Sequence, residues 1–293
     1  VFPGHHLDGA SLYNLFEEEK VTMSAGVPTI WLGLLNHVKA NNLKFSTFKS
    51  TVIGGAACPP AMIRTFENDY NVEVVHAWGM TELSPVGTLG RLKSKHANLA
   101  PEAKQKILEK QGKSVFGVDM RIVDAEGNVQ PWNGVATGDL EVRGHWVIDS
   151  YFGGEGAKAF TTDKDGKKWF ATGDVSKINR EGFMQITDRS KDVIKSGGEW
   201  ISSIDLENVA MAHPAVHEAA VISVYHPKWD ERPLLVVVRK PGVEVSKQEL
   251  LDFYEGKVAK YCLPNDVAFV DELPHTATGK IQKLKLREQF KDY

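Results

Sequence analysis

The chain has 293 residues, about two domains' worth, and its 35 Lys and Arg residues against 38 Asp and Glu give a net charge of −3, which provides no basic footprint for a nucleic acid. Apolar residues make up 42% of the chain without a run near the roughly 20 residues of a membrane helix, so we expect a soluble globular protein. Two distant cysteines, Cys58 and Cys262, exclude a disulfide scaffold and a Cys-rich zinc site and favour a cytoplasmic location.

The first part of the chain, residues 1–113, alternates helical and strand-like patterns. Short apolar runs at 51–53 and 72–76 predict strands between stretches with apolar residues at helical spacing. Residues 91–113 lack this alternation and predict a surface connection with one helix near 102–109. The alternation indicates α/β layers.

The middle part, residues 114–188, carries shorter patterns typical of strands and turns. Runs at 120–123 and 140–144 predict strands. Two further runs within 175–187 flank the turn-forming residues 179–182, a pattern typical of a β-hairpin. We therefore expect a β-rich subdomain here.

The pattern changes again near residue 189, where we place a domain boundary. Beyond it the sequence predicts helices and strands in mixed order, at 204–212, 219–224, 234–239, 250–258 and 267–270, before a closing helix. The predicted fold class is thus α/β and α+β: a partial α/β layered subdomain (1–113), a β-rich subdomain (114–188) and a small α+β domain (189–293).

A first candidate site combines the small residues after two predicted strands, Gly54–Ala57 and Ala77–Glu82. Glycines there let a ligand approach the backbone, and α/β sheets bind ligands at strand ends. Trp78 can stack on a flat ring, Thr81 offers a hydroxyl to a phosphate, and Glu82 is a hard oxygen ligand suited to Mg²⁺. The simpler alternative is an ordinary turn beside a core aromatic residue.

A second candidate is Trp169–Asp174, where an Asp follows Thr-Gly. An Asp in this position can accept two charge-assisted hydrogen bonds from the vicinal hydroxyls of a ribose. An Asp turn without a ligand is the simpler alternative.

A third candidate is the stretch Asp188–Trp200, in which charged residues lead into Gly197 and Gly198. Charge runs usually form solvated surface. Because this one lies at the predicted domain boundary, a hinge and a ligand clamp are both open as interpretations.

A fourth candidate is the polar loop Leu273–Ile281, which presents Lys280. A lysine there can stabilise negative charge that develops on a phosphoryl or carboxylate oxygen. A surface lysine in a plain loop is the alternative. No His or Cys cluster has the spacing of a zinc site.

Taken together and in this order, the four motifs resemble those of the adenylate-forming superfamily of acyl-CoA synthetases, adenylation domains and luciferases. Trp78–Glu82 resembles its aromatic-Gly-x-Thr-Glu motif, Thr172–Asp174 its ribose-binding Thr-Gly-Asp, Asp188–Asp192 its interdomain linker, and Pro274–Lys280 its terminal Pro-x-Thr-x-x-Gly-Lys motif. The segments Ser196–Ser202 and His226–Pro233 are most similar to bacterial medium- and long-chain fatty acyl-CoA synthetases. Close relatives that activate methylthio-substituted short acids share much of this pattern.

The resemblance implies a site built from all four motifs. Lys280, Glu82 and Thr81 would be catalytic, and Glu82 would bind Mg²⁺. Nucleotide binding would fall to residues in three of the motifs: Gly55, Ala56, Ala77, Trp78, Gly79, Asp174, Arg189 and Lys195. Lys191 would be the hinge of a mobile C-terminal domain (189–293), and Gly197, Gly198 and Trp200 would line the acyl and coenzyme A tunnel, with Trp200 as its gate. A buried aromatic at a domain interface is the alternative for Trp200.

One departure from the family pattern concerns the phosphate loop, which family members carry upstream of the aromatic-Gly-x-Thr-Glu motif. The 77 residues before Trp78 contain no Ser/Thr/Gly-rich loop ending in Pro-Lys-Gly, and the chain begins at Val1. We therefore expect a C-terminal portion of a longer synthetase, with residues 1–188 as the end of its large domain.

The resemblance implies a fatty acid–CoA ligase that uses ATP, Mg²⁺ and coenzyme A, forms acyl-AMP, and works without nucleic acid or a transmembrane segment. A homodimer of the full-length enzyme is a further expectation. Two alternatives stay open: an adenylation domain that passes the acyl group to a carrier protein, and a non-catalytic module that binds acyl-AMP or nucleotide.

Overall fold

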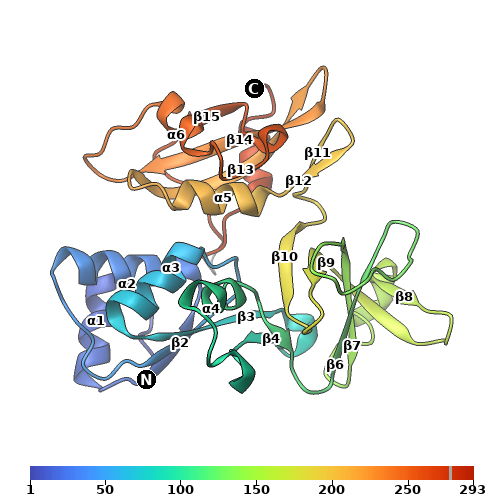
Figure 1. The fold of residues 1–293 in the computed structure, drawn as a ribbon, viewed down its shortest axis with the longest axis horizontal. Helices are drawn as coiled ribbons and strands as arrows, with labels where there is room; N and C mark the ends of the chain where they lie inside the picture. The colour runs from blue at the N-terminus through green and yellow to red at the C-terminus, as the bar shows by residue number, and fades with distance from the viewer. Residues whose placement is uncertain (277–278) are drawn as a thin grey trace. The chain divides into compact units, whose positions relative to one another are not determined.

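The computed structural model describes residues 1–276 and 279–293, which divide into two compact units, residues 1–186 and 187–293 (Figure 1). The division falls two residues before the boundary that we expect after residue 188. The predicted mixture of α/β and α+β structure is confirmed. None of the described helices has the length and apolar content that crossing a bilayer requires.

The first unit opens with an α/β layer. Its sheet has the strand order β1 (Met23–Gly26), β2 (Ser50–Ile53), β3 (Glu73–Gly79), β4 (Val86–Gly90) and β5 (Lys113–Ser114). The first three strands are parallel and the last two antiparallel to their neighbours. Helix α1 (Gly9–Glu18) precedes β1, α2 (Pro28–Ala40) and α3 (Pro60–Arg64) connect the parallel strands, and α4 (Pro101–Leu108) follows β4. The helix predicted near 102–109 is confirmed as α4.

Helix starts follow from local chemistry. Asp8 precedes α1 and its carboxylate accepts the Ser11 N–H at 2.9 Å, which satisfies a backbone donor that the helix leaves unpaired. Pro28 opens α2, where the missing N–H costs nothing. Aromatic side chains from α1, α2 and the strand connections, Phe16, Trp31 and Phe48, then meet in the core against Ile53 of β2.

His76 lies in the middle of β3 and is buried, with its Nδ1 3.1 Å from the Glu109 carbonyl. Burial lowers the pKa of His76 to about 4. Between that pKa and the unfolded value near 6.5, only the unfolded chain binds the proton, so stability falls as pH falls through this window. We expect the free energy of unfolding to drop by about 2 kcal/mol from this group between pH 7 and pH 5.

The check is His76→Gln, which removes the titrating group. Urea unfolding at pH 7 and pH 5 is expected to show a pH difference about 2 kcal/mol smaller in His76→Gln than in the parent chain. An equal pH difference in both proteins contradicts a neutral buried His76.

The rest of the first unit is β-rich, as predicted. Its sheet has the order β10 (Met184–Arg189), β9 (Lys168–Ile178), β7 (Thr137–Gly144) and β6 (Val118–Val123), and β8 (Phe160–Thr162) pairs with β9. The predicted hairpin is confirmed: Asn179 Oδ1 accepts the N–H groups of Glu181 and Phe183 at 3.1 and 2.9 Å, which shapes the turn between β9 and β10.

The second unit is a sheet with helices on both faces. It contains β11 (Ile194–Ser196), β12 (Glu199–Ile201), β13 (Val216–His226), β14 (Asp230–Arg239), β15 (Asp266–Phe269), α5 (Ser203–Met211), α6 (Lys247–Phe253) and α7 (Lys283–Gln289). Along β13, Ala219 and Val221 pack in the cluster that holds α5 and α6, whereas Ala220 and Ile222 pack against Leu286 of α7. This alternation is the two-residue period of a strand buried on both faces.

Several elements follow the predicted ranges closely. The capping box ahead of α6 is confirmed, because Ser246 Oγ accepts the Glu249 N–H at 3.1 Å while Glu249 accepts the Ser246 N–H at 3.3 Å. The structure also contains six short strands that the sequence did not predict: β1, β4, β5, β8, β11 and β12. They span two to five residues, too few for a clear alternation of apolar and polar side chains.

Candidate active site

The carboxyl ends of β2 and β3 lie side by side, because Ile53 pairs with His76 in parallel register. Gly54 follows β2, and a Cβ there would lie 2.9 Å from the Ala77 carbonyl oxygen, so a side chain at 54 would force the strand ends apart. Gly55 takes a φ of +81°, and both Gly55 and Ala56 are exposed. Backbone is therefore exposed at this edge, which a ligand site at the first motif needs and which an ordinary turn also allows.

Residues Ala77–Gly79 belong to β3 and pair with β4, whereas we expected them to follow the strand. The Trp78 side chain is only 7% exposed and packs with Leu83 and the β-rich sheet. Its burial favours the simpler alternative, a core aromatic, over a ring that is exposed for stacking. The indole N–H donates to Asp174 Oδ2 at 2.8 Å, which directly joins two residues of different motifs.

Asp174 follows a bulge in β9. Ala171 faces Glu141 and Val175 faces Asp139, so residues 172–174 stand opposite residue 140 alone. The Thr172 hydroxyl fastens the bulge by donating to the Leu140 carbonyl at 2.9 Å and accepting the Asp174 N–H at 3.2 Å.

Within the bulge, Gly173 takes a φ of +74° and has no atom within 4 Å of a Cβ placed on it. Asp174 itself is 2% exposed. Open space therefore adjoins the bulge on the Gly173 side, while the carboxylate is held inside against Trp78. The Thr-Gly-Asp sequence thus forms a bulge that directs the buried Asp174 carboxylate toward the Trp78 indole N–H.

Glu82 lies in a short turn, Thr81–Leu83, directly after β3, and Thr81 is exposed. The Tyr151 hydroxyl donates to Glu82 Oε1 at 2.8 Å, and the Ile148 N–H donates to the Glu82 carbonyl at 2.9 Å. Burial and the bond to Glu82 raise the pKa of Tyr151, which keeps its hydroxyl a donor. Residues 148–151 thus orient Glu82.

The chemistry around Glu82 fits a magnesium ion that is shared with phosphates. Within residues 1–276 and 279–293, no group of three or more His, Cys, Asp and Glu side chains is placed to hold a metal ion. Mg²⁺ in nucleotide sites uses one or two carboxylates and completes its shell with phosphate oxygens and waters. One oriented carboxylate beside the exposed Thr81 hydroxyl matches that donor set.

In the second unit, Gly197 and Gly198 form the turn between β11 and β12, with φ values of +58° and +89°. The Gly197 N–H donates to the Trp229 carbonyl at 2.8 Å, which holds the turn against the start of β14. Lys195 and Trp200 pair across the hairpin, and Trp200 is 54% exposed. The predicted nucleotide contact Lys195 and the predicted tunnel residues Gly197, Gly198 and Trp200 therefore lie in one hairpin.

Lys280 lies in what we term the Lys280 loop, residues 274–282, of which Ala277 and Thr278 lie outside the described residues. The Thr276 N–H donates to the Lys280 carbonyl at 2.8 Å, and the Lys280 N–H donates to Thr276 Oγ1 at 3.1 Å. At the base, the Gln282 N–H donates to the Pro274 carbonyl at 2.7 Å. The described part of this loop is thus closed by backbone bonds on both sides of Lys280.

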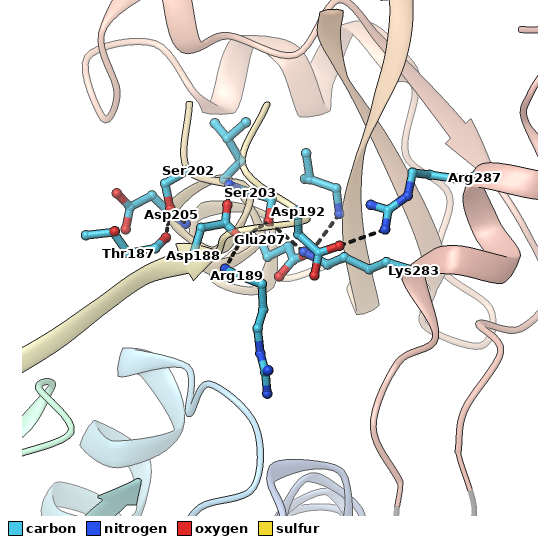
Figure 2. Close-up of polar contacts among 12 residues, drawn as sticks. Thr187, Asp188, Arg189, Asp192, Ser202, Ser203, Asp205, Glu207, Lys283 and Arg287 are labelled. Carbon is cyan, nitrogen blue, oxygen red and sulfur yellow. Dashed lines mark hydrogen bonds and ion pairs between the residues drawn. The ribbon is translucent and has the colours of Figure 1, made fainter. Parts of the chain in front are cut away.

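The predicted hinge, Lys191, is exposed and lies in a turn, Arg189–Val193, which we term the hinge turn. The Asp192 and Val193 N–H groups donate to the Arg189 carbonyl at 2.9 and 3.0 Å. Figure 2 shows the Arg189 guanidinium extending away from the polar cluster that surrounds Asp188. Burial raises the pKa of Asp188 to about 6, against the opposing effects of Lys283 and of hydrogen bonds from Ser203 and Arg189.

The predicted site residues form two groups, one in each unit. The first holds the strand-end residues together with Asp174, linked through Trp78: Gly55, Ala56, Ala77, Trp78, Gly79, Thr81, Glu82 and Asp174. The second holds the hairpin, the hinge turn and the Lys280 loop: Arg189, Lys191, Lys195, Gly197, Gly198, Trp200 and Lys280.

Comparison with known proteins decides the family. The sequence profile of AMP-binding enzymes matches residues 1–152, more than half of the chain, and that of the AMP-binding enzyme C-terminal domain matches residues 205–280. The chain belongs to the AMP-binding enzyme family. The adenylate-forming resemblance carried by the four motifs is therefore confirmed.

Curated relatives of this AMP-binding enzyme chain are CoA ligases. It is 54% identical to the 3-methylmercaptopropionyl-CoA ligase of Ruegeria lacuscaerulensis and 48% identical to the medium-chain fatty acid–CoA ligase of Ectopseudomonas oleovorans, covering 53% of each relative with 100% of its own length. It is 44% identical to the long-chain fatty acid–CoA ligase of Thermus thermophilus and covers 54% of it. The chain spans about half the length of the curated relatives it matches.

Solved structures agree with this assignment. An anthranilate CoA ligase in complex with anthranoyl-AMP matches 99% of this AMP-binding enzyme chain at a TM-score of 0.85 and 27% identity, over 54% of its own length. ATP-bound MatB from Rhodopseudomonas palustris matches 97% of the chain at a TM-score of 0.79 and 29% identity, also over 54% of its own length. The predicted small C-terminal domain belongs to the shared fold.

Sequence reasoning missed several residues that support the site in this AMP-binding enzyme chain. Tyr151 orients Glu82 from 69 residues away, and no local pattern around it signals that contact. Ser203, Glu207 and Lys283 surround Asp188 in the second unit. Ser203 follows an N-cap serine and Lys283 follows the Lys280 motif by three residues, so only their proximity to known motifs could have drawn attention to them.

Proposed function

We propose that this chain is the C-terminal portion of an AMP-forming acyl-CoA synthetase. The enzyme activates a medium- or long-chain carboxylic acid with ATP to acyl-AMP and then transfers the acyl group to coenzyme A. The observation that carries the proposal is the buried Trp78–Asp174 contact beside the open strand ends of β2 and β3. A carboxylate fixed by a hydrogen bond and strand ends with exposed backbone are the two features that support recognition of a ribose and a flat base.

Nucleotide recognition in this proposal rests on the first unit. Gly55 and Ala56 offer exposed backbone, and Ala77 lies at the end of the neighbouring strand. Asp174 is the proposed acceptor of the ribose hydroxyls, and the Trp78 N–H holds its carboxylate in place. Because Asp174 is buried, its carboxylate has to become accessible when the nucleotide binds. Arg189 is a second ribose contact from the hinge turn.

In the first half-reaction the substrate carboxylate attacks the α-phosphorus of ATP, and pyrophosphate leaves with the electron pair of the broken P–O bond. Such a step needs charge neutralisation more than proton transfer. The Lys280 ammonium stabilises the carboxylate and bridging oxygens, and Thr81 donates to a phosphate oxygen. Mg²⁺ supplies charge neutralisation on the phosphates when bound, and the Glu82 carboxylate is the group that would hold it.

In the second half-reaction the coenzyme A thiol attacks the acyl carbon, and AMP leaves. We propose that the C-terminal domain rotates about Lys191 for this step, which withdraws Lys280 and brings the Gly197–Gly198 turn to the pantetheine path. Lys195 contacts the AMP phosphate in one state, and Trp200 gates the acyl tunnel. Trp200 is 54% exposed, which leaves its ring open to a ligand, and a buried aromatic at a domain interface stays the alternative.

Two classes of carboxylic acid are candidates for the substrate: fatty acids and methylthio-substituted short acids. Two relatives with identities of 54% and 53% are named for 3-methylmercaptopropionate, and two fatty acid ligases have identities of 48% and 44%. A methylthio-substituted short acid is therefore the second candidate substrate. Transfer to a carrier protein, a non-catalytic nucleotide-binding role, a homodimer and a cytoplasmic location stay predictions.

The test is acid-dependent pyrophosphate release with Mg·ATP, with and without coenzyme A. It is run on the chain alone and on the chain joined to the upstream half of a relative, with decanoate, palmitate and 3-methylmercaptopropionate. Release that depends on a fatty acid supports the proposal, and AMP release that depends on coenzyme A separates it from carrier-protein transfer. Pyrophosphate release with 3-methylmercaptopropionate but with neither fatty acid selects the second candidate substrate. Nucleotide binding without pyrophosphate release, in the chain alone and in the joined protein, contradicts the proposed enzymatic activity.

Asp174→Ala is expected to raise the KM for ATP by roughly 10- to 100-fold, since a charge-assisted hydrogen bond to the ribose is worth about 1.5–3 kcal/mol. Steady-state kinetics with varied ATP checks this. Trp78→Phe is the companion variant, because it keeps an aromatic ring and removes the N–H that holds Asp174 together with part of the buried indole. Its KM is expected to rise less, and an unchanged KM for ATP in Asp174→Ala contradicts the ribose contact.

A further inference from the structure

A buried polar cluster in the second unit joins the hinge turn to two helices. Figure 2 shows carboxylates, hydroxyls and cations from residues 187–192, from α5 and from α7 converging on one place. None of the four sequence motifs predicts this convergence. The inference that it carries rests on the proposed function.

The chain entering the hinge turn is fastened to the first turn of α5. The Ser203 N–H donates to Asp188 Oδ2 at 2.6 Å, and the Ser203 hydroxyl donates to Asp188 Oδ1 at 3.0 Å. The Ser202 hydroxyl also donates to the Thr187 carbonyl. Asp188 is buried, so its charge depends on these donors and on a nearby cation.

Lys283, the first residue of α7, is that cation. Its ammonium donates to the Ser203 hydroxyl at 2.6 Å and pairs with Glu207 Oε1 at 2.7 Å. Glu207 also accepts the Val221 N–H at 2.8 Å, on the outer edge of β13. Burial opposes the charge on Lys283, but Glu207 and Asp188 outweigh it and hold its pKa above the ordinary value.

The contacts of Lys283 therefore connect helices on opposite faces of the sheet. Helix α5 packs with one face of β13 and α7 with the other, and the two meet around the open edge of this strand. A second tie runs from Arg287 of α7 to Asp192 Oδ1 at 2.8 Å. Both ends of the hinge turn are thus anchored to α7, one through Ser203 and one directly.

The Lys280 loop leads directly into α7, which begins at Lys283. Gln282 closes the base of that loop through its N–H to Pro274 and its side-chain amide to the His275 carbonyl. Lys283 is the next residue, so its anchor lies directly at the base. On the other strand of the loop, His275 Nε2 lies 3.3 Å from Glu218 of β13.

We infer that Lys283 is a positioning residue for Lys280: by bridging Ser203 and Glu207 it fixes the base of the Lys280 loop to α5 and to the hinge turn. Lys280 and the hinge turn then move as one body, so the angle of the domain determines where the Lys280 ammonium lies. Without the bridge, α7 loses its tie to α5, and the contacts that remain to the described part of the loop and to α7 include the loop's backbone bonds, His275 with Glu218, the packing of Ile281 and Leu286, and Arg287 with Asp192.

The test compares three variants, in the chain joined to an upstream half where activity needs it. Lys283→Met removes the charge at similar length, Ser203→Ala removes the shared hydroxyl and leaves all charges, and Lys285→Met is the control on the exposed side of α7. We expect Lys283→Met to lower ATP–pyrophosphate exchange by about 10- to 100-fold, since misplacement of a catalytic group by about 1 Å has such effects. Ser203→Ala is expected to fall between Lys283→Met and the control.

Thioester formation from supplied acyl-AMP separates positioning from loss of fold. Because Lys280 acts only in adenylation, this second rate is expected to stay within about twofold in all three variants. Equal loss of both half-reactions in Lys283→Met and in Ser203→Ala overturns the inference. So does adenylation in Lys283→Met at the level of Lys285→Met.

Amide hydrogen exchange on this chain gives a readout that needs no activity. Lys283→Met is expected to speed exchange at the Thr276, Gly279 and Lys280 amides by at least about tenfold, with the α6 amides unchanged. Exchange equal to that of Lys285→Met overturns the anchor whether or not the enzyme is active. Absence of both half-reactions in the parent protein contradicts the proposed function instead, so the two failures are distinguishable.

Discussion

Lys280→Ala is expected to lower acyl-AMP formation by at least about a hundredfold while thioester formation from supplied acyl-AMP is retained. The lysine lies in a loop whose backbone bonds hold it between Thr276 and Gln282, so its ammonium is presented by a defined frame. Negative charge is present on the attacking carboxylate and on the phosphates in the first half-reaction. In the second half-reaction the β- and γ-phosphates have already left as pyrophosphate, the substrate carboxylate is bound covalently as acyl-AMP, and AMP leaves with its own negative charge, so the charges that Lys280 is proposed to neutralise in adenylation are no longer brought together.

The measurement is ATP–pyrophosphate exchange for the first half-reaction and thioester formation from chemically supplied acyl-AMP for the second. Lys285→Ala is the control, because Lys285 is an exposed lysine on the helix that follows the same loop. It is expected to leave both rates unchanged. If Lys280→Ala slows the two half-reactions to the same extent, the lysine does not act in adenylation alone and its assigned role is wrong.

Gly79→Ala is expected to destabilise the first unit by about 3 kcal/mol, because the added methyl group has no room. A Cβ on Gly79 would lie 2.0 Å from the Pro85 carbonyl oxygen and 3.0 Å from the Pro85 carbonyl carbon. Both are backbone atoms of the turn that leads into β4, and Met80 donates its N–H to that same oxygen at 2.8 Å. Relief of the clash requires the turn that carries Thr81 and Glu82 to move.

Gly33→Ala is the matched control for this prediction. It is the same chemical change in helix α2, where a Cβ would have no atom within 4 Å. It is expected to stabilise the chain by about 1 kcal/mol, since alanine favours the helix over glycine. Urea unfolding of both variants checks the opposite signs, and a Gly79→Ala midpoint at or above that of the parent chain contradicts the requirement for glycine at this position.

Gly79→Ala has a functional consequence if the proposed function holds. Displacement of the Thr81–Leu83 turn moves Glu82 away from the Tyr151 hydroxyl that orients it. The residual folded fraction is therefore expected to show weaker dependence of pyrophosphate release on Mg²⁺ than Gly33→Ala. Gly79, the last residue of β3, is thus expected to affect both the stability of the first unit and the proposed Mg²⁺ dependence.

The family and the order of its motifs could be predicted from the sequence because each motif is local. Trp78–Glu82, Thr172–Asp174 and Pro274–Lys280 are contiguous segments in which residue type and spacing carry the signal. The α4 helix and the hairpin between β9 and β10 were predictable for the same reason, since a helical period and a four-residue turn depend on neighbours in sequence. The short strands were not, since two to five residues hold too little periodicity.

The burial of Trp78 marks the limit of that reasoning. Aromatic residues at a strand end are equally suited to a ring-stacking surface and to a core. The choice depends on what covers the strand end, which is the β-rich sheet with Phe170 and Met120 brought there by the fold. Tertiary structure alone joined Trp78 to Asp174, 96 residues away.

By itself the sequence determined the family, the four motifs, the layered α/β start and the small α+β end, because these follow from residue type and from short-range periodicity. Only the tertiary structure decided that Asp174 is held by Trp78, that Tyr151 orients Glu82, and that Lys283 ties the Lys280 loop to the hinge turn. Each of these contacts joins residues 69 to 96 positions apart. Such contacts depend on how the strands and helices pack against one another, and packing at that separation leaves no periodic trace in the chain.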